Sequence, residues 1–296
     1  MLGMINAKEI LKKARDGRYA IGQFNVSNLE TVKAILGAAQ NFNSPVIIGT
    51  SEGEREFIGR RQIVKLIEAY QEELQIPIIL NADHTKSFEE IKKVVDAGYS
   101  AVHFDGSELS FEENIKITKE VMEYAKSRSE NILVEGELGY LRGGSTVHEA
   151  VEIKEEDMTK PDEAAEFVKE TGIDSLAVVI GNVHGIVKGG NPKLDLEHLK
   201  KIKEATGHAY RQAGETFLVL HGGSGIDEKD IREAIKIGIV KVNINTELRV
   251  AYVGTLRNFL SVKPEETTPY KIFPDVISAI QKITEDKIKL FGGEKI

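Results

Sequence analysis

Three histidines occur directly after short apolar segments, in the sequences ADHT, NVHG and LHGG. They are His84, His184 and His221. Three neutral imidazoles with one open coordination position form the ligand set of a catalytic Zn²⁺, and zinc suits a chain without cysteine. We therefore predict a zinc site at these residues. His103 stands inside its apolar segment and is more typical of an interior histidine than of a ligand. The other histidines are predicted to be solvated: His148, His198 and His208.

Carboxylates accompany these histidines at the ends of the apolar segments. Asp83 precedes the first predicted ligand, and a carboxylate close to a metal-bound substrate can act as a general acid or base. Asp105, Glu135 and Glu137 end two further segments. Such groups can instead orient metal-bound histidines as hydrogen-bond acceptors, and this is the interpretation we favour for Glu135.

Two short motifs, HGGSG and NINT, stand at the ends of two neighbouring apolar segments and indicate a phosphate site. Each is followed by a helical pattern, so glycine backbone N–H groups and hydroxyls would gather at two helix starts. The alternative is that these glycines only form tight turns.

Eight apolar segments alternate with longer amphipathic ones. They cover residues 19–26, 45–51, 76–83, 101–106, 131–138, 175–181, 216–222 and 240–245. Several are almost continuously hydrophobic, as expected for parallel strands that are covered on both faces. The alternation predicts the α/β class and a (β/α)₈ TIM barrel, in which all the polar segment ends meet at one rim. A doubly wound open sheet is the alternative.

We expect a single barrel domain over residues 1–296, with a carboxy-terminal helical extension from residue 263. The long glycine-rich intervals after residues 138 and 181 are candidate lids.

Composition excludes several classes of protein. Lys and Arg number 39 against 47 Asp and Glu, and the basic residues are scattered, which argues against a nucleic-acid partner. No apolar run approaches the roughly 20 residues that span a bilayer, and the amino terminus does not resemble a secretory signal. We expect a cytoplasmic protein that acts on a small molecule and has no membrane partner.

The segments FNVSNLET, ADHTKSFEEI, VEGELG, GNVHG, LHGGSGI and VNINTELR together resemble the zinc-dependent class II aldolases, which cleave fructose 1,6-bisphosphate or tagatose 1,6-bisphosphate. The resemblance runs through nearly the whole chain. It implies a lyase of glycolysis or related carbohydrate metabolism, acting most often on fructose 1,6-bisphosphate. The products would be dihydroxyacetone phosphate and glyceraldehyde 3-phosphate, formed through a zinc-stabilised enediolate. It also implies a homodimer or homotetramer.

The resemblance assigns roles to individual residues. His84, His184 and His221 match the metal ligands, and Asp83 matches the residue that moves the proton of the leaving hydroxyl. Asp105 and Glu137 match a second metal position of some members. The residues that match the cradle for dihydroxyacetone phosphate are Gly185, Gly222, Ser224, Asn243 and Thr246. Glycines around Val183 match a site for a monovalent cation, Na⁺ or K⁺, in part of the family.

The chain departs from the family pattern at four places. Thr85 follows the first ligand where relatives have glycine, and Asn245 stands where they often have aspartate. Glu149 is a possible lid acid or base, although its spacing from the Gly-Gly pair differs from that of relatives. The arginine that meets the second phosphate has no clear match in TTPYKIFPDVISAI.

Other functions remain open at this point. A metal-dependent hydrolase could use the same three histidines, and a non-catalytic sugar-phosphate-binding barrel would tolerate the departures. A Schiff-base aldolase needs a lysine inside the barrel, and the segment 175–181 contains none. The sequence does not decide between the fructose and tagatose epimers.

Overall fold

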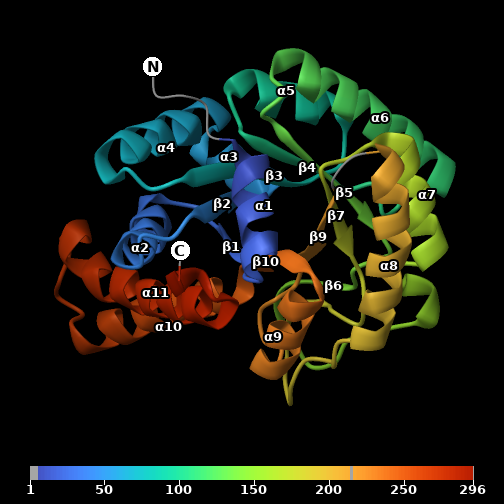
Figure 1. Ribbon diagram of the computed structural model, residues 1–296. Coiled ribbons are helices and arrows are strands. Elements are labelled where there is room, and N and C mark those ends of the chain that lie inside the picture. The colour runs from blue at the N-terminus through green and yellow to red at the C-terminus, as the bar shows by residue number, and fades with distance from the viewer. Residues whose placement is uncertain (1–5, 214–215, 296) are drawn as a thin grey trace.

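The computed structural model describes residues 6–213 and 216–295, without the side chains of 208–213 and 295. Within them, eight parallel strands close into a barrel in the order β1-β10-β9-β7-β5-β4-β3-β2 (Figure 1). These strands are β1 (Ile21–Asn25), β2 (Val46–Thr50), β3 (Ile78–Thr85), β4 (Ala101–Phe104), β5 (Leu133–Leu138), β7 (Ser175–Val178), β9 (Phe217–Leu220) and β10 (Ile239–Ile244). Each overlaps one predicted apolar segment, so the predicted (β/α)₈ barrel is confirmed.

Helices cover the outside of the barrel. They are α2 (Leu29–Asn41), α3 (Glu52–Ile58), α4 (Arg60–Leu74), α5 (Phe88–Ala97), α6 (Phe111–Arg128), α7 (Pro161–Thr171), α8 (Leu196–Ala213) and α9 (Glu228–Ile237). Local chemistry fixes where several begin: Ser87 and Ser110 accept hydrogen bonds from the third residue of α5 and of α6. The described residues contain no helix with the length and apolar character needed to span a membrane.

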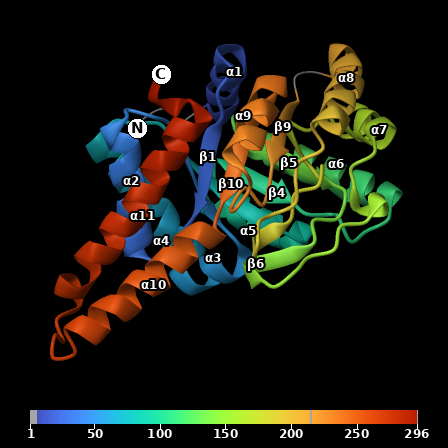
Figure 2. The same ribbon diagram turned by 90° about the horizontal axis from the view of Figure 1, so that it is seen from below.

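The helix α1 (Ala7–Gly17) closes one end of the barrel. Its Ala7, Leu11 and Ala14 are buried in one apolar cluster with barrel residues that include Ile21 and Phe217. Figure 2 shows α1 at one end of the barrel and β6 (Gly143–His148) at the other. Because α1 blocks the amino-terminal end, a ligand can reach the interior only from the carboxyl ends of the strands.

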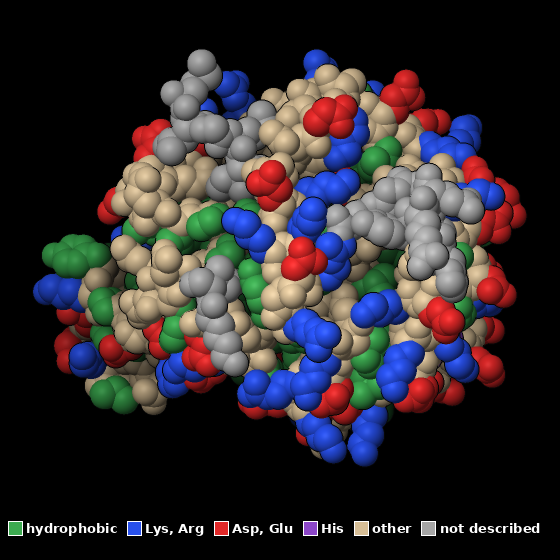
Figure 3. All heavy atoms as spheres, in the orientation of Figure 1, with side chains coloured by type: hydrophobic (Ala, Val, Ile, Leu, Met, Phe, Trp, Pro, Cys, Tyr) green, Lys and Arg blue, Asp and Glu red, His purple; other side chains and the backbone are tan. Residues whose placement is uncertain are grey.

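Two long helices end the chain, and the second of them forms the predicted carboxy-terminal extension. These are α10 (Thr246–Val262) and α11 (Pro269–Phe291), which lie side by side and project beside α2 (Figure 2). Val276 and Ile280 anchor α11 in the main core. Hydrophobic side chains lie at the outer end of this hairpin (Figure 3), where Val262 is 67% exposed and Tyr270 77%.

The structure also contains a two-stranded parallel sheet that was not predicted. It pairs β6 with β8 (His184–Val187), and Gly143 lies opposite His184. The backbone N–H of His184 also donates to the carbonyl of Arg142 over 2.8 Å. The two 3₁₀ turns are η1 (Glu155–Asp157) and η2 (Gly293–Lys295).

Candidate metal centre and anion cavity

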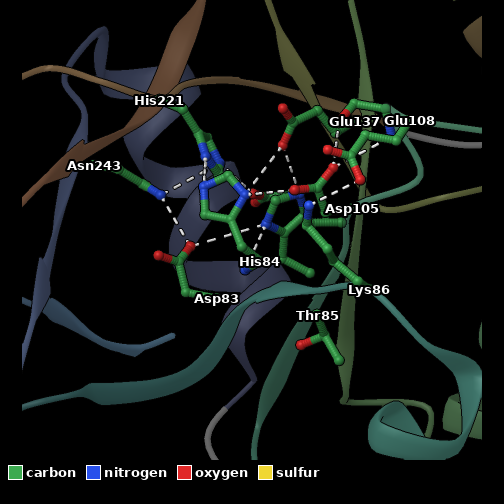
Figure 4. A network of polar contacts seen from close by, with 12 residues as sticks. Asp83, His84, Thr85, Lys86, Asp105, Glu108, Glu137, His221 and Asn243 are labelled. Atoms are coloured by element: carbon green, nitrogen blue, oxygen red, sulfur yellow. Dashed lines mark hydrogen bonds and ion pairs between the residues drawn. The ribbon is translucent and has the colours of Figure 1, made fainter. Parts of the chain in front are cut away.

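The three predicted metal ligands converge at the carboxyl end of the barrel. His84 lies at the end of β3, His184 begins β8, and His221 follows β9. The ring centre of His84 is 4.8 Å from that of His184 and 4.7 Å from that of His221. Nε2 of His84 and Nδ1 of His221 face each other across 3.0 Å (Figure 4). Two nitrogens bound to one tetrahedral Zn²⁺ would lie about 3.3 Å apart, so this pair has the spacing of metal ligands.

Carboxylates orient the other nitrogens of these two rings. Nδ1 of His84 lies 2.9 Å from an oxygen of Asp105, and Nε2 of His221 lies 2.8 Å from Glu135. The second contact is the one predicted for Glu135. Each carboxylate fixes the orientation of its ring and favours a proton on the ring nitrogen that it contacts. The other ring nitrogens, Nε2 of His84 and Nδ1 of His221, then carry lone pairs that point to the space between the rings. A divalent cation fits this donor set.

A buried lysine supports Glu135 from inside the barrel. Lys241 on β10 donates from Nζ to the second oxygen of Glu135 over 2.7 Å, and neither residue is more than 1% exposed. Sequence reasoning missed Lys241, although it is the only charge in an otherwise apolar strand. The resulting chain runs from Lys241 through Glu135 to His221. Because its ammonium group is bound to a carboxylate, Lys241 has an electrostatic function in this arrangement.

His103 on β4 is fully buried in the barrel, as predicted. Its Nδ1 accepts the backbone N–H of His84 at 3.1 Å, and its Nε2 lies 3.0 Å from Glu137 without forming a hydrogen bond. Its ring nevertheless belongs to a group with Asp83, His84 and His221 whose ligand atoms all lie within 4.8 Å of one another. His103 thus lies closer to the predicted ligands than its sequence position suggested.

A second group that could hold a metal joins His84, Asp105 and Glu137, the pair of carboxylates predicted for a second metal position. Oε2 of Glu137 is buried without a hydrogen-bond partner and lies 3.6 Å from Nδ1 of His84. A cation would satisfy this oxygen.

Three amides hold the carboxylate of Asp83. Gln23 and Asn25 on β1 donate to its two oxygens over 2.8 and 3.0 Å, and Asn243 on β10 donates over 3.2 Å. The side chain is almost completely buried. Gln23 and Asn25 were missed by sequence analysis, although two polar residues in alternation within YAIGQFNV are a detectable signal. Together the amides aim Asp83 into the same space as the histidines.

The local charges favour an ionised Asp83 and neutral rings at His184 and His221. Burial acts to raise the pKa of Asp83, but the neighbouring imidazoles, above all His84, hold that pKa well below its usual value. Burial lowers the pKa of His184 and His221, and the nearby His84 lowers both pKa values further. Burial also opposes protonation of His84, yet Asp83 and Asp105 raise its pKa above the ordinary value. The environment of His84 therefore favours a positive charge, whether a proton or a metal carries it.

The end of β3 has an unusual backbone. His84 has φ +43°, in the left-handed region that residues other than glycine rarely adopt. The fully buried Arg55 holds this end by donating to the carbonyls of Thr50 and Asp83, over 2.7 and 3.1 Å, and to the hydroxyl of Thr85 over 2.8 Å. Thr85 points away from the histidines (Figure 4). The departure from glycine at Thr85 thus provides a partner for Arg55 and leaves the lining of the cavity unchanged.

A cavity opens beside the histidines and is lined by all five predicted phosphate residues. They are Gly185, Gly222, Ser224, Asn243 and Thr246. The hydroxyl of Ser224 accepts the first backbone N–H groups of α10 from Asn245 and Glu247, over 3.3 and 3.4 Å. The side chain of Asn245, which precedes the first residue of α10, forms no capping hydrogen bond of its own. Asn245 and Thr246 line the cavity, so the positive end of this helix lies at the cavity.

Gly222 has φ +65° and lies so close to β8 that a Cβ atom would be 2.1 Å from the carbonyl oxygen of Val183. Only glycine allows this approach of the backbone.

The cavity is also lined by Ser51, Ser145 and Arg249, and we call this part its far end. Arg249 donates to Glu54 over 2.6 Å and to the carbonyl of Ser145 over 3.3 Å. Asn245, the other departure from the family pattern, also lines the cavity and donates to the hydroxyl of Ser145 over 3.4 Å. Arg249 was missed because one arginine in a helix start resembles any solvated charge.

Glu149 lies outside the cavity. It is 82% exposed and forms an ion pair with Lys188. His148 and His198, predicted to be solvated, are instead half-buried: their Nε2 atoms contact the carbonyls of Gly144 and Thr159 over 2.8 and 2.7 Å. The side chain of His208 lies outside the described residues.

Known proteins resemble this chain over nearly its whole length. The model of the family described as fructose-bisphosphate aldolase class-II matches residues 5–295. A fructose-bisphosphate aldolase of Geobacillus stearothermophilus is 40% identical, over 99% of this chain and 98% of its own. One from Staphylococcus aureus strain Mu50 is also 40% identical, over 98% and 97% of the two chains.

Solved structures agree with these matches. The YdjI aldolase from Escherichia coli K12 superposes with a TM-score of 0.81 at 32% identity and covers 98% of both chains. A putative fructose-1,6-biphosphate aldolase from Coccidioides immitis gives a TM-score of 0.83 at 30% identity, over 98% of this chain and 96% of its own.

Proposed function

The chain belongs to the class II fructose-bisphosphate aldolase family, and on that premise we propose that it reversibly cleaves a ketose 1,6-bisphosphate, with fructose 1,6-bisphosphate as the main substrate. The products would be dihydroxyacetone phosphate and glyceraldehyde 3-phosphate. Tagatose 1,6-bisphosphate is the alternative substrate. The observation that carries the proposal is the convergence of three histidines and Asp83 beside a glycine-lined cavity.

A class II aldolase is a lyase that uses a metal, and we propose Zn²⁺ as the ion. His84, His184 and His221 would hold it. When bound, the ion acts as a Lewis acid that stabilises negative charge on the ketone oxygen of the substrate. Asp105 and Glu137 would offer a second metal position, supported by the unpartnered oxygen of Glu137.

Asp83 is the proposed general base. Its carboxylate takes the proton of the C4 hydroxyl while the C3–C4 bond breaks, so that C4 becomes the aldehyde carbon and the electron pair stays on the other fragment. The low pKa of Asp83, set by the neighbouring histidines against the effect of burial, keeps the group ionised. Asn243 would donate a hydrogen bond to the negative oxygen that develops on this fragment.

The phosphate of the dihydroxyacetone half would bind at the start of α10. Ser224, Thr246 and the backbones of Gly185 and Gly222 supply donors there, and the positive end of the helix favours an anion. A monovalent cation, Na⁺ or K⁺, would bind the carbonyl oxygens near Val183, which approach Gly222 closely.

The other half of the substrate would face Ser51 and Arg249. Arg249 is the proposed contact of the second phosphate. Glu149 is the candidate for moving the proton at C3, which requires the segment around β6 to turn it inward from its contact with Lys188.

The proposal also covers domain organisation, assembly and location. Residues 1–296 would form a single domain, assembled as a homodimer or homotetramer in the cytoplasm. The exposed apolar residues Val250, Val253 and Leu260 on α10 support assembly, because monomers rarely expose such a stripe.

One coupled assay tests the function. Fructose and tagatose 1,6-bisphosphate are supplied with and without EDTA, and Zn²⁺ or Co²⁺ is then restored. We expect cleavage into two triose phosphates that stops with chelator and returns with metal. Release of inorganic phosphate would indicate a hydrolase instead. Unchanged sugar-phosphate binding without turnover, before and after EDTA, would indicate a binding barrel. Full turnover by His184→Ala would refute that ligand.

A further inference from the structure

The far end of the cavity contains a charge arrangement that the reaction itself does not require. Glu54, on α3, is only 6% exposed, and all of its hydrogen bonds lie on the wall of the active site. One oxygen accepts from the backbone of Ser51 at 2.8 Å and from Asn25 at 2.9 Å. The other lies 2.6 Å from Nη2 of Arg249. Glu54 is thus a fixed negative charge beside the arginine proposed to meet the second phosphate.

Arg249 is the only lysine or arginine among the described residues that line the active-site cavity or the cavity next to it. A phosphate group carries nearly two negative charges at neutral pH, and its strongest side-chain partners are arginine and lysine, through charge-assisted hydrogen bonds. Here the single guanidinium is already neutralised by Glu54, and a phosphate bound to it would also lie close to that carboxylate.

A second cavity of about 340 Å³ continues from this point. It shares Asn25, Asn245 and Arg249 with the active-site cavity. Its remaining walls combine hydroxyl and carboxylate groups with apolar surface, contributed by Ser27, Thr31, Glu54, Leu248, Tyr252 and Val253. Glu54 and the asparagines are good partners for sugar hydroxyls, whereas the apolar wall would solvate a phosphate poorly.

From these observations we propose that Glu54 sets the substrate range of the proposed aldolase by holding Arg249, so that the enzyme also cleaves ketose 1-phosphates whose other half is an uncharged polyhydroxylated chain. The inference rests on the proposed function and extends its substrate class. The bond change is the same. The C3–C4 bond breaks, Asp83 takes the C4 hydroxyl proton, and the products are dihydroxyacetone phosphate and a neutral hydroxyaldehyde.

The test compares kcat/KM for fructose 1,6-bisphosphate and fructose 1-phosphate with the metal-loaded full-length enzyme. In the wild type we expect the bisphosphate to be favoured by less than about 100-fold. Glu54→Gln keeps the shape of the side chain and removes its charge, so Arg249 becomes free to bind phosphate. The preference for the bisphosphate should then rise at least tenfold, mainly through a lower KM for that sugar.

Two further variants sharpen the comparison. Arg249→Met should bring the two kcat/KM values closer than in the wild type. Glu52→Gln is the matched control, because Glu52 lies on the same helix but is half-exposed and does not line either cavity. Its preference should equal that of the wild type. Retained cleavage of fructose 1-phosphate by Glu54→Gln shows that the variant is folded.

Distinct outcomes overturn the inference and the proposed function. A wild-type preference above about 1000-fold, or a preference that Glu54→Gln changes less than twofold, would overturn the role of Glu54 while leaving an aldolase. Cleavage of neither sugar with metal present would overturn the proposed function, and the substrate range with it.

Discussion

The two ends of the active-site cavity are built differently. At the metal end, His221 and Asp83 are 1% and 4% exposed, and interior side chains bind their polar atoms. At the far end, the side chain of Arg249 is 47% exposed and Ser145 is partly exposed. The groups proposed to break the bond are therefore fixed by the barrel, whereas those that meet the second half of the substrate lie on helices and loops around it.

This difference separates chemistry from specificity. A change at the metal end leaves a buried polar group without its partner, which costs stability as well as activity. A change at Ser145 or Arg249, which are partly exposed at the far end, exposes one more group to water and costs little. We therefore expect substitutions at the metal end to act on turnover and metal affinity, and those at the far end to act on KM.

Asp83→Asn should cause the largest loss. It removes the proposed base while keeping the shape of the side chain, and we expect kcat to fall by about 10²–10⁴-fold. Steady-state cleavage of fructose 1,6-bisphosphate measures the loss, and metal analysis should show an unchanged metal content per subunit. A kcat within tenfold of the wild type would show that a group other than Asp83 takes the proton. The proposed division between a metal end that carries the chemistry and a far end that sets KM would then fail.

Lys241→Met should weaken metal binding and have little effect on the chemical step. Without its partner Glu135 holds His221 less firmly, and we expect the metal dissociation constant, measured by chelator competition, to rise by about 10–100-fold. The value of kcat at saturating metal should change only a few-fold.

The matched control for Lys241→Met is Lys126→Met. Lys126 pairs with buried Asp174 over the same 2.7 Å but contacts no residue of the metal centre. Both substitutions should lower the midpoint of thermal unfolding. Equal metal affinities of the two variants would show that Lys241 is only structural.

Gln23→Met tests how the amides tune Asp83. Gln23 donates to the carboxylate, and loss of a donor that favours the charged form should raise the pKa of Asp83. Because activity requires the ionised carboxylate, the fall of kcat toward low pH should begin at a higher pH than in the wild type.

Gln23→Met should also change how the free energy of unfolding depends on pH. A carboxylate with a lowered pKa stabilises the folded state above its unfolded pKa of about 3.9, and this contribution is lost as pH falls. Gln23→Met should therefore reduce the free energy of unfolding at pH 7. Gln40→Met, on the exposed side of α2, is the control and should leave both profiles unchanged. An unshifted kcat profile in Gln23→Met would contradict the tuning.

Ser145→Ala should have the smallest effect. Ser145 contributes a hydroxyl at the far end, and one partly exposed neutral hydrogen bond is worth about 0.5–1.5 kcal/mol. The KM for fructose 1,6-bisphosphate should rise about two- to fivefold with kcat unchanged. Ser127→Ala, on the outer side of α6, provides the control. A fall in kcat of more than tenfold would place the far end in the chemical step.

Sequence patterns predicted the barrel because each strand carries its own signal. Buried parallel strands are continuous apolar segments, and the alternation with helices leaves few topologies. The β6–β8 sheet escaped prediction because GGSTVH and HGIV are short, polar and far apart in the chain. Their pairing depends on where the barrel brings them.

The candidate site was predicted only in part for a similar reason. His84, His184 and His221 were identified because residue type and position together are informative. Lys241 and Arg249 were missed because a single lysine or arginine has no distinctive spacing. Their functions arise from Glu135 and Glu54, which the fold brings within reach from distant segments.

The β6–β8 pairing also links motion at the rim to the metal centre. Gly143 lies opposite His184, and the backbone N–H of His184 donates to the carbonyl of Arg142, so β6 is hydrogen-bonded to the main chain that carries this imidazole. A swing of β6 toward or away from the cavity would therefore displace the backbone of His184. If His184 holds the proposed ion, tighter ion binding would also restrain β6.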